Sequence, residues 1–273
     1  MARGWGFLAV LGVAGSAQAG SLAPAARARA VVDAQLAAIT DPIAFRALLA
    51  PDTLIIGNGS VAVAEHANAA AIVALLGASP SQLPVLETEV TRLDAGGTVD
   101  AVWLTADITF LHAVRFGRTV TRDLSSARLT ELVVADGAGW KVAALAFDST
   151  AGTTAPGDAL PAASTGPLTA LLGSPYKLDA AVRDDPTTLA TLRGDRVVGA
   201  AEVHRLLAPW RYRDAKTSAA FELRAKSWGF VIADVAIAGD SHLSRDPELH
   251  TRILLCAIAD ADRWRIVALH ATP

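Results

Sequence analysis

The chain has 273 residues, of which 52% are hydrophobic, 19% charged and 5% aromatic, and its formal net charge is −3. This composition excludes a disordered tail, a collagen-like fibre and a strongly basic nucleic-acid-binding protein. The single cysteine, Cys256, excludes an internal disulfide and a cysteine-based zinc cluster.

Residues 1–19 have the features of a secretory signal peptide. A positive charge at Arg3 precedes an apolar stretch from Phe7 to Val13, and Ala17-Gln18-Ala19 offers small residues for cleavage. About eight to ten apolar residues are too few to cross a bilayer, which takes about 20. We therefore expect an exported protein, periplasmic or secreted, that is cleaved near Ala19 and has no membrane span. A buried N-terminal helix is the alternative.

The first half of the remaining chain should form helices and then a sheet. Residues 24–39 have apolar side chains at helical spacing, and Asp41-Pro42 is a typical cap and first turn of a further helix. Another alanine-rich helix is expected at 63–76. The apolar residues then alternate, which predicts two hairpins. Their strands are expected at 85–93, 99–111, 128–134 and 140–148, with the first turn at Ala95-Gly96-Gly97.

The second half repeats the first. Residues 149–167 are rich in Ala, Thr and Pro, which is linker composition. Residues 128–148 and 252–272 align without a gap, with six identities in 21 positions. The identical pairs are Arg128/Arg252, Ala135/Ala259, Asp136/Asp260, Trp140/Trp264, Ala144/Ala268 and Leu145/Leu269. The second set of strands is then expected at 219–226, 229–237, 252–258 and 264–270.

Weaker similarities precede this segment in the same order. The run Pro51-Asp52-Thr53-Leu54 resembles Pro186-Thr187-Thr188-Leu189, and Asp41-Pro42 resembles Ser174-Pro175. Each half should therefore be a separate domain, at 20–148 and 168–273, joined by the linker.

The order of elements resembles the nuclear-transport-factor-2-like superfamily, in particular its SnoaL-like and ketosteroid-isomerase-like domains. Their last strand often reads Trp-basic-aliphatic, followed by His and Ser/Thr at alternate positions. Trp264-Arg265-Ile266, His270 and Thr272 match that strand. In the first copy Trp140-Lys141-Val142 match, but Ala146 and Asp148 replace His and Ser/Thr. The resemblance implies an α+β fold of two cone-shaped repeats, each with helices packed on a curved, mainly antiparallel sheet.

Two polar positions near the ends of the predicted hairpins are candidate ligand contacts. If the 259–263 turn pairs Ile258 with Trp264, the register places Arg252 opposite His270, while Arg128 lies near Asp148 in the first copy. His270 would then be a neutral hydrogen-bonding group at one end of a pocket, next to a fixed cation. A cross-strand polar pair at the sheet margin is the alternative.

Asp107 and Asp234 occupy corresponding strands. Asp107 shares a face with Trp103, and a carboxylate among apolar groups has a raised pKa and can transfer protons. The alternative is that this is the solvated face of the sheet. The candidate ligand-binding residues are therefore Trp103, Asp107, Arg128, Asp148, Asp234, Arg252 and His270.

The sequence leaves two functions open. The first is a non-catalytic exported protein whose modules bind a small apolar molecule or associate, either as a pseudo-dimer within the chain or as a homo-oligomer. The second is an isomerase, cyclase or dehydratase with Asp107 or His270 as acid or base.

No cofactor, metal site or nucleic-acid partner is expected, because the chain has no P-loop, GxGxxG, GxSxG or HExxH pattern. The cluster Trp210-Arg211-Tyr212-Arg213 mixes aromatic and basic residues, but four residues are too few for a nucleic-acid surface. A helix end or a domain contact is expected there instead.

Overall fold

The computed structural model describes residues 23–39, 41–57, 60–63, 82–137, 139–149, 160, 165–192, 195–238 and 248–272. These residues form two mixed sheets of six strands with a few short helices, which confirms the predicted α+β class. The predicted signal peptide and most of the predicted linker lie outside the described residues. So does the helix predicted at 63–76, apart from Val63, which ends a strand.

The first sheet and its helices form the N-terminal module. Its helices are α1 (Pro24–Ala37) and α2 (Pro42–Ala47). Its strands are β1 (Leu49–Gly57), β2 (Ser60–Val63), β3 (Gln82–Gly97), β4 (Ala101–Phe116), β5 (Thr119–Asp136) and β6 (Gly139–Ser149). The strand order is β2-β1-β6-β5-β4-β3, and all neighbours are antiparallel except β1 and β6.

The second sheet and its helices form the C-terminal module. Its helices are α4 (Pro167–Leu172), α5 (Pro175–Ala181), α6 (Ala200–Leu207) and the 3-10 turn η1 (Ala208–Trp210). Its strands are β7 (Leu189–Leu192), β8 (Asp195–Val198), β9 (Ala215–Arg224), β10 (Trp228–Ala238), β11 (Glu248–Asp260) and β12 (Arg263–Thr272). The order β8-β7-β12-β11-β10-β9 matches that of the first sheet strand for strand.

The repeat extends to an irregularity in the backbone. In the N-terminal module the register shifts between Leu132 and Val133, which leaves Ala143 as a bulge in β6. In the C-terminal module the shift falls between Cys256 and Ala257, 124 positions later, and leaves Val267 as the bulge. Because bulges re-aim the side chains beyond them, both strands curve at the same point.

Most predicted elements are confirmed, but the first hairpin turn is not at 95–97. Strand β3 continues through Gly96 and Gly97, and the chain turns at 98–100 instead. These glycines are needed for space: a Cβ at Gly96 would overlap the side chains of Thr187 and Trp103. The cap predicted at Asp41 is confirmed, because its carboxylate accepts hydrogen bonds from Ile43 N and Ala44 N, at 3.0 and 3.1 Å.

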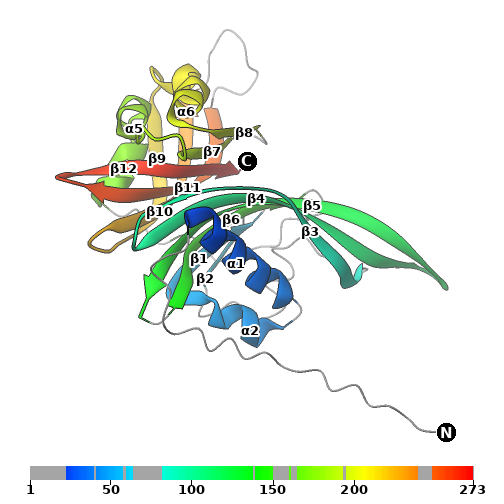
Figure 1. Cartoon of the computed structure of the whole chain (residues 1–273). Coiled ribbons are helices and arrows are strands. Elements are labelled where there is room, and N and C mark those ends of the chain that lie inside the picture. The colour runs from blue at the N-terminus through cyan, green and yellow to red at the C-terminus, as the bar shows by residue number, and fades with distance from the viewer. Residues whose placement is uncertain are drawn as a thin grey trace, which may run out of the picture.

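The molecule has four layers, with the two sheets in the middle and the helices outside (Figure 1). One face of each sheet packs against its own helices, and the other faces the opposite sheet. Side chains from both sheets fill the space between them, among them Trp103, Leu132, Phe230 and Cys256, all fully buried. This apolar contact holds the two modules together within one chain.

Candidate functional site

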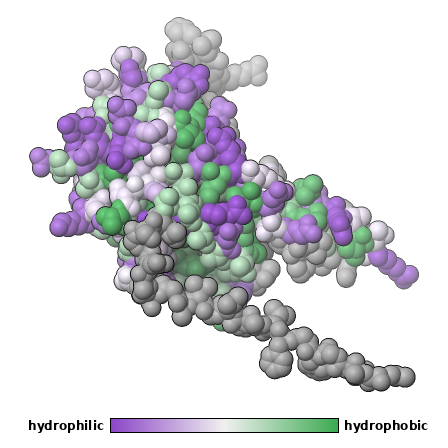
Figure 2. Space-filling view, in the orientation of Figure 1, coloured by the Kyte–Doolittle hydropathy of each residue, from purple (hydrophilic) through white to green (hydrophobic). Residues whose placement is uncertain are grey.

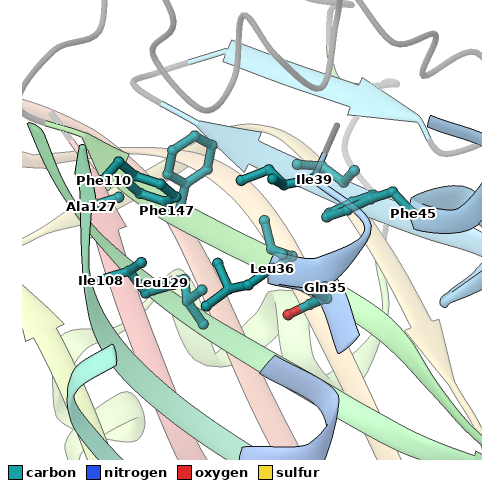
Figure 3. Close-up of a pocket in the computed structure, with 11 residues that line it drawn as sticks. Gln35, Leu36, Ile39, Phe45, Ile108, Phe110, Ala127, Leu129 and Phe147 are labelled. Carbon is teal, nitrogen blue, oxygen red and sulfur yellow. The ribbon is translucent and has the colours of Figure 1, made fainter. Parts of the chain in front are cut away.

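The N-terminal module encloses a pocket between its helices and the concave face of its sheet (Figure 3). The pocket has a volume of about 40 Å³, several times what a single water molecule needs. Apolar side chains of α1, α2, the turn between them and strands β1, β4, β5 and β6 line it, and among the described residues Gln35 is the polar residue of the lining. The apolar residues are Leu36, Ile39, Phe45, Ile55, Ile108, Phe110, Ala127, Leu129, Leu145 and Phe147.

Gln35, which lines this pocket, is hydrogen-bonded to a buried acid. Its amide Nε2 donates a hydrogen bond of 2.6 Å to Oε1 of Glu131, a residue of β5 whose exposed fraction is 0%. The other oxygens of the pair, Gln35 Oε1 and Glu131 Oε2, are buried and have no hydrogen-bond partner among the described residues. Leaving buried polar atoms unsatisfied costs about 1–3 kcal/mol each. The Gln35–Glu131 pair therefore lowers the free energy of unfolding of the protein.

Burial also decides the charge of Glu131. Loss of hydration raises the pKa of its carboxyl to about 8, and the hydrogen bond from Gln35 offsets only part of that rise. At neutral pH the carboxyl is therefore mostly protonated. Its hydroxyl is a hydrogen-bond donor, while Gln35 Oε1 is an acceptor, so the pair offers one group of each kind.

The equivalent positions of the C-terminal module do not hold such a pair. Leu255, on the inward face of β11, is the equivalent of Glu131, because it lies 124 positions later in the chain. Leu168 is the equivalent of Gln35, because each lies six residues before a helix cap, Ser174 of α5 and Asp41 of α2. Both leucines belong to the apolar core between the second sheet and its helices. The two modules therefore share a fold but differ at the position where the first one holds its acid.

Asp107 lies on the opposite face of the first sheet from the pocket. Its carboxylate is bound by two cations, at 2.6 Å from Arg128 Nε and 2.9 Å from Arg196 Nη1. Arg196 comes from β8 of the C-terminal module, is only 2% exposed at its side chain, and also pairs with Asp94. Burial lowers the pKa of this guanidinium, and Asp107 and Asp94 oppose that effect. Asp107 is thus part of an ion-pair cluster between the modules.

The register predicted for the second hairpin is wrong by two residues, because the turn pairs Ile258 with Arg265 rather than Trp264 and the bulge at Val267 adds a further residue. Arg252 pairs with Thr272 and not with His270, which lies opposite Leu254. The guanidinium of Arg252 instead binds Asp234 on the neighbouring strand, with Nε to Oδ1 at 2.6 Å. The structure therefore brings together Arg252 and Asp234, as it does Arg128 and Asp107, but it separates Arg252 from His270.

His270 points at the N-terminal module. Its exposed fraction is 0%, its Nδ1 lies 2.8 Å from Thr130 Oγ1, and its Nε2 lies 3.0 Å from Asp148 Oδ2. Trp103 also faces the other module, since its indole Nε1 donates a 2.8 Å hydrogen bond to the carbonyl of Thr187. The predicted candidates thus gather at the inter-module face or on the strands beside it, and none of them lines the pocket described above.

Sequence reasoning missed Glu131 and Gln35. A signal was present in the aligned segments, where the acid of Arg128-Leu129-Thr130-Glu131 stands opposite a leucine in Arg252-Ile253-Leu254-Leu255. A lone charge in an apolar, inward-facing strand position indicates a buried acid.

A second polar cluster lies on the outer side of the C-terminal module. Asp179 of α5 is almost fully buried and binds His204 Nδ1 at 2.8 Å and the guanidinium of Arg211. Arg211 caps the 3-10 turn η1, so the Trp210–Arg213 segment lies at a helix end, one of the two roles expected for it. Hydrophilic side chains dominate the visible surface of this module (Figure 2).

In the described part of the chain, no group of three or more His, Cys, Asp or Glu residues is placed to hold a metal. No described helix is long and apolar enough to cross a membrane.

No family model and no curated protein matches the chain. Solved structures that resemble part of it include a ketosteroid isomerase-like protein from Erwinia carotovora atroseptica (16% identity, 46% of this chain, 95% of that one, TM-score 0.35). Another is a putative Ca/calmodulin-dependent kinase II association domain from Exiguobacterium sibiricum (14% identity, 47% of this chain, 95% of that one, TM-score 0.36). A third is an NTF2-like protein from Cytophaga hutchinsonii (17% identity, 44% of this chain, 93% of that one, TM-score 0.34). Each covers about half of this chain, the length of one module, and the likeness is one of fold alone.

Proposed function

We propose that the N-terminal module binds a small apolar molecule that carries a hydroxyl group, and that the C-terminal module serves as its packed partner. The observation that carries this proposal is that Gln35, which lines an otherwise apolar pocket, binds the buried Glu131, and that Gln35 Oε1 and Glu131 Oε2 have no partner among the described residues. The Gln35 side chain has to turn for a ligand to reach these two atoms. A ligand hydroxyl can donate to the first and accept from the second, which would satisfy both atoms at once.

The size of the pocket limits the ligand. A volume of about 40 Å³ is far below the roughly 300–1,000 Å³ of a site for a drug-sized molecule. The ligand is therefore a short chain or one end of a longer apolar molecule. Export, expected from residues 1–19, would give the protein access to such molecules outside the cytoplasm.

The test is methyl NMR of the whole protein with matched small molecules. Propanol should shift the methyl signals of Ile108, Leu129 and Leu145. Chloropropane, which lacks the hydroxyl, should bind about thirtyfold more weakly, because it loses two neutral hydrogen bonds of about 1 kcal/mol each. Leu255 and Leu168 are internal controls and should not shift. The proposal is wrong if neither compound moves the signals of the pocket, or if both move the signals of the control leucines equally.

Acid–base catalysis by Glu131 is a second candidate. A raised pKa of about 8 suits a group that transfers protons near neutral pH. We would incubate the protein with small ketones in deuterated water and follow exchange next to the carbonyl by NMR. Exchange that disappears in Glu131→Gln, while binding persists, would favour an enzyme. Binding without exchange above the level of buffer would leave the non-catalytic function.

A further inference from the structure

The apolar part of the contact between the two modules has approximate twofold symmetry. Strand β12 approaches β5, and its counterpart β6 approaches β11, the counterpart of β5. Equivalent positions of the two modules also enter the same buried cluster. These pairs are Leu54/Leu189, Trp103/Phe230, Leu132/Cys256, Val134/Ile258, Ala143/Val267 and Ala144/Ala268. On apolar packing alone, each sheet could pair with a copy of itself.

The polar contacts break this symmetry. His270 of the C-terminal module binds Thr130 and Asp148 of the N-terminal module. The repeat places Ala146 at the position of His270, and it places Leu254 and Thr272 at the positions of its two partners. The contact is therefore made in one direction and replaced by apolar or small side chains in the other.

Arg196 breaks the symmetry on the side of the cation, since Asp234 stands at the position of Asp107. It reaches from β8 to Asp94, Asp107 and the carbonyl of Thr105, to which its Nη2 donates a 2.9 Å hydrogen bond. Val61 stands at the equivalent position of β2, because Ile56 pairs with Val61 as Thr191 pairs with Arg196. Thus both the histidine and the arginine come from one module, and their acids come from the other.

We propose that the inter-module face is hetero-specific, so that each sheet accepts the other module and rejects a second copy of itself. Two N-terminal modules would bring Asp148 to Ala146 and would give Asp94 and Asp107 no Arg196. Two C-terminal modules would bury His270 against Leu254. Burying charged or polar groups without partners is expensive, and proteins use that cost to exclude wrong partners.

Cleavage of the folded chain tests this. A protease site is placed at residues 153–156 of the full-length protein, and the cleaved product is mixed with its isotope-labelled form and weighed by native mass spectrometry. Every pair should contain one N-terminal and one C-terminal fragment, whether or not the labelled and unlabelled fragments have exchanged partners. Homodimers in more than about a tenth of the pairs, or separation into monomers, would overturn the proposal.

Two variants keep the test informative. Cleaved His270→Ala/Asp148→Thr keeps the Arg196 contacts and should lose part of its selectivity, with homodimers rising at least fivefold. A reversed variant moves the contact to the equivalent positions of the other module. The original contact is removed by His270→Ala, Asp148→Thr and Thr130→Leu. The new contact is built by Ala146→His, Thr272→Asp and Leu254→Thr. It should again give mixed pairs only. Homodimers from the reversed variant at the level of the double variant would contradict the assigned role of the histidine contact.

Discussion

The two modules share strand order, bulge position and helix caps, yet their interiors differ. The N-terminal module holds Gln35 and Glu131 beside a pocket, whereas the C-terminal module has Leu168 and Leu255 in a continuous apolar core. Replacing a buried polar pair by leucines is the change expected when a site is lost and only stability is retained. This difference is the one expected from the proposed function, in which one copy holds the site and the other serves as its support.

The largest expected effect is the pH dependence of stability that Glu131 causes. Its pKa is about 8 when folded and near the ordinary 4.5 when unfolded, so the folded state binds the proton more tightly between these values. Stability is therefore full below about pH 4.5 and falls as the pH rises to about 8, by roughly 4 kcal/mol. Urea unfolding at several pH values measures this loss.

The matched control is Glu131→Gln, which keeps the shape and cannot ionise. It should remove the fall between pH 5 and 8, as should Glu131→Leu, which copies the residue of the C-terminal module. An unchanged slope in both variants would show that Glu131 is ionised in the folded protein, and the buried acid could not then be a hydrogen-bond donor at neutral pH.

Arg196 should have the next largest effect. Arg196→Met keeps the bulk of a nearly buried side chain but removes the cation that binds Asp94 and Asp107. Breaking a buried ion pair on one side costs about 3 kcal/mol, to be measured by urea unfolding. Arg205→Ala, at an exposed pair with Glu202, should cost less than about 1 kcal/mol. Equal losses would mean that the inter-module cluster contributes no more than a surface pair.

A smaller loss is expected at Gly96. In Gly96→Ala the new methyl group would overlap Thr187 and Trp103, so the modules must move apart locally. Overpacking of this kind costs about 1–3 kcal/mol, measurable as a lower midpoint of thermal unfolding. Gly139→Ala, where a Cβ meets nothing within 4 Å, is the control and should leave the midpoint almost unchanged. An unchanged midpoint of thermal unfolding in Gly96→Ala would refute the close approach of Gly96 to Thr187 and Trp103.

The helix caps give the smallest difference between the modules. Asp41 accepts two backbone hydrogen bonds, whereas Ser174, its counterpart, accepts one from Lys177 N at 3.4 Å. Asp41→Ala should therefore cost about 1 kcal/mol and Ser174→Ala about half of that, by urea unfolding. The reverse order would mean that the second cap is the stronger one.

The sequence predicted the elements better than the site. Alternation and caps located the strands near Trp140 and Trp264 because local periodicity determines them. The pairing of Arg252 was missed because the turn pairs Ile258 with Arg265 and the bulge at Val267 adds a second residue of shift. A bulge also reverses which face the side chains beyond it take. The parallel strands β1 and β7 carry no alternating pattern, because both of their faces are buried.

The polar positions that differ between the copies were predicted as divergent pocket residues. In the structure, Asp148 and His270 instead bind each other across the modules. No pattern along one strand could show this, because the partners are 122 residues apart and meet only once both sheets have formed. The buried Glu131 was visible in the alignment, but only the fold shows what surrounds it.

A crystal structure under xenon pressure tests most directly whether the two interiors differ. Xenon enters dry apolar cavities. It should occupy the N-terminal pocket beside Leu129 and Phe147 and leave the core around Leu255 empty. Xenon at equal occupancy beside Leu129 and around Leu255, or around Leu255 alone, would contradict the account that the two interiors differ at this position.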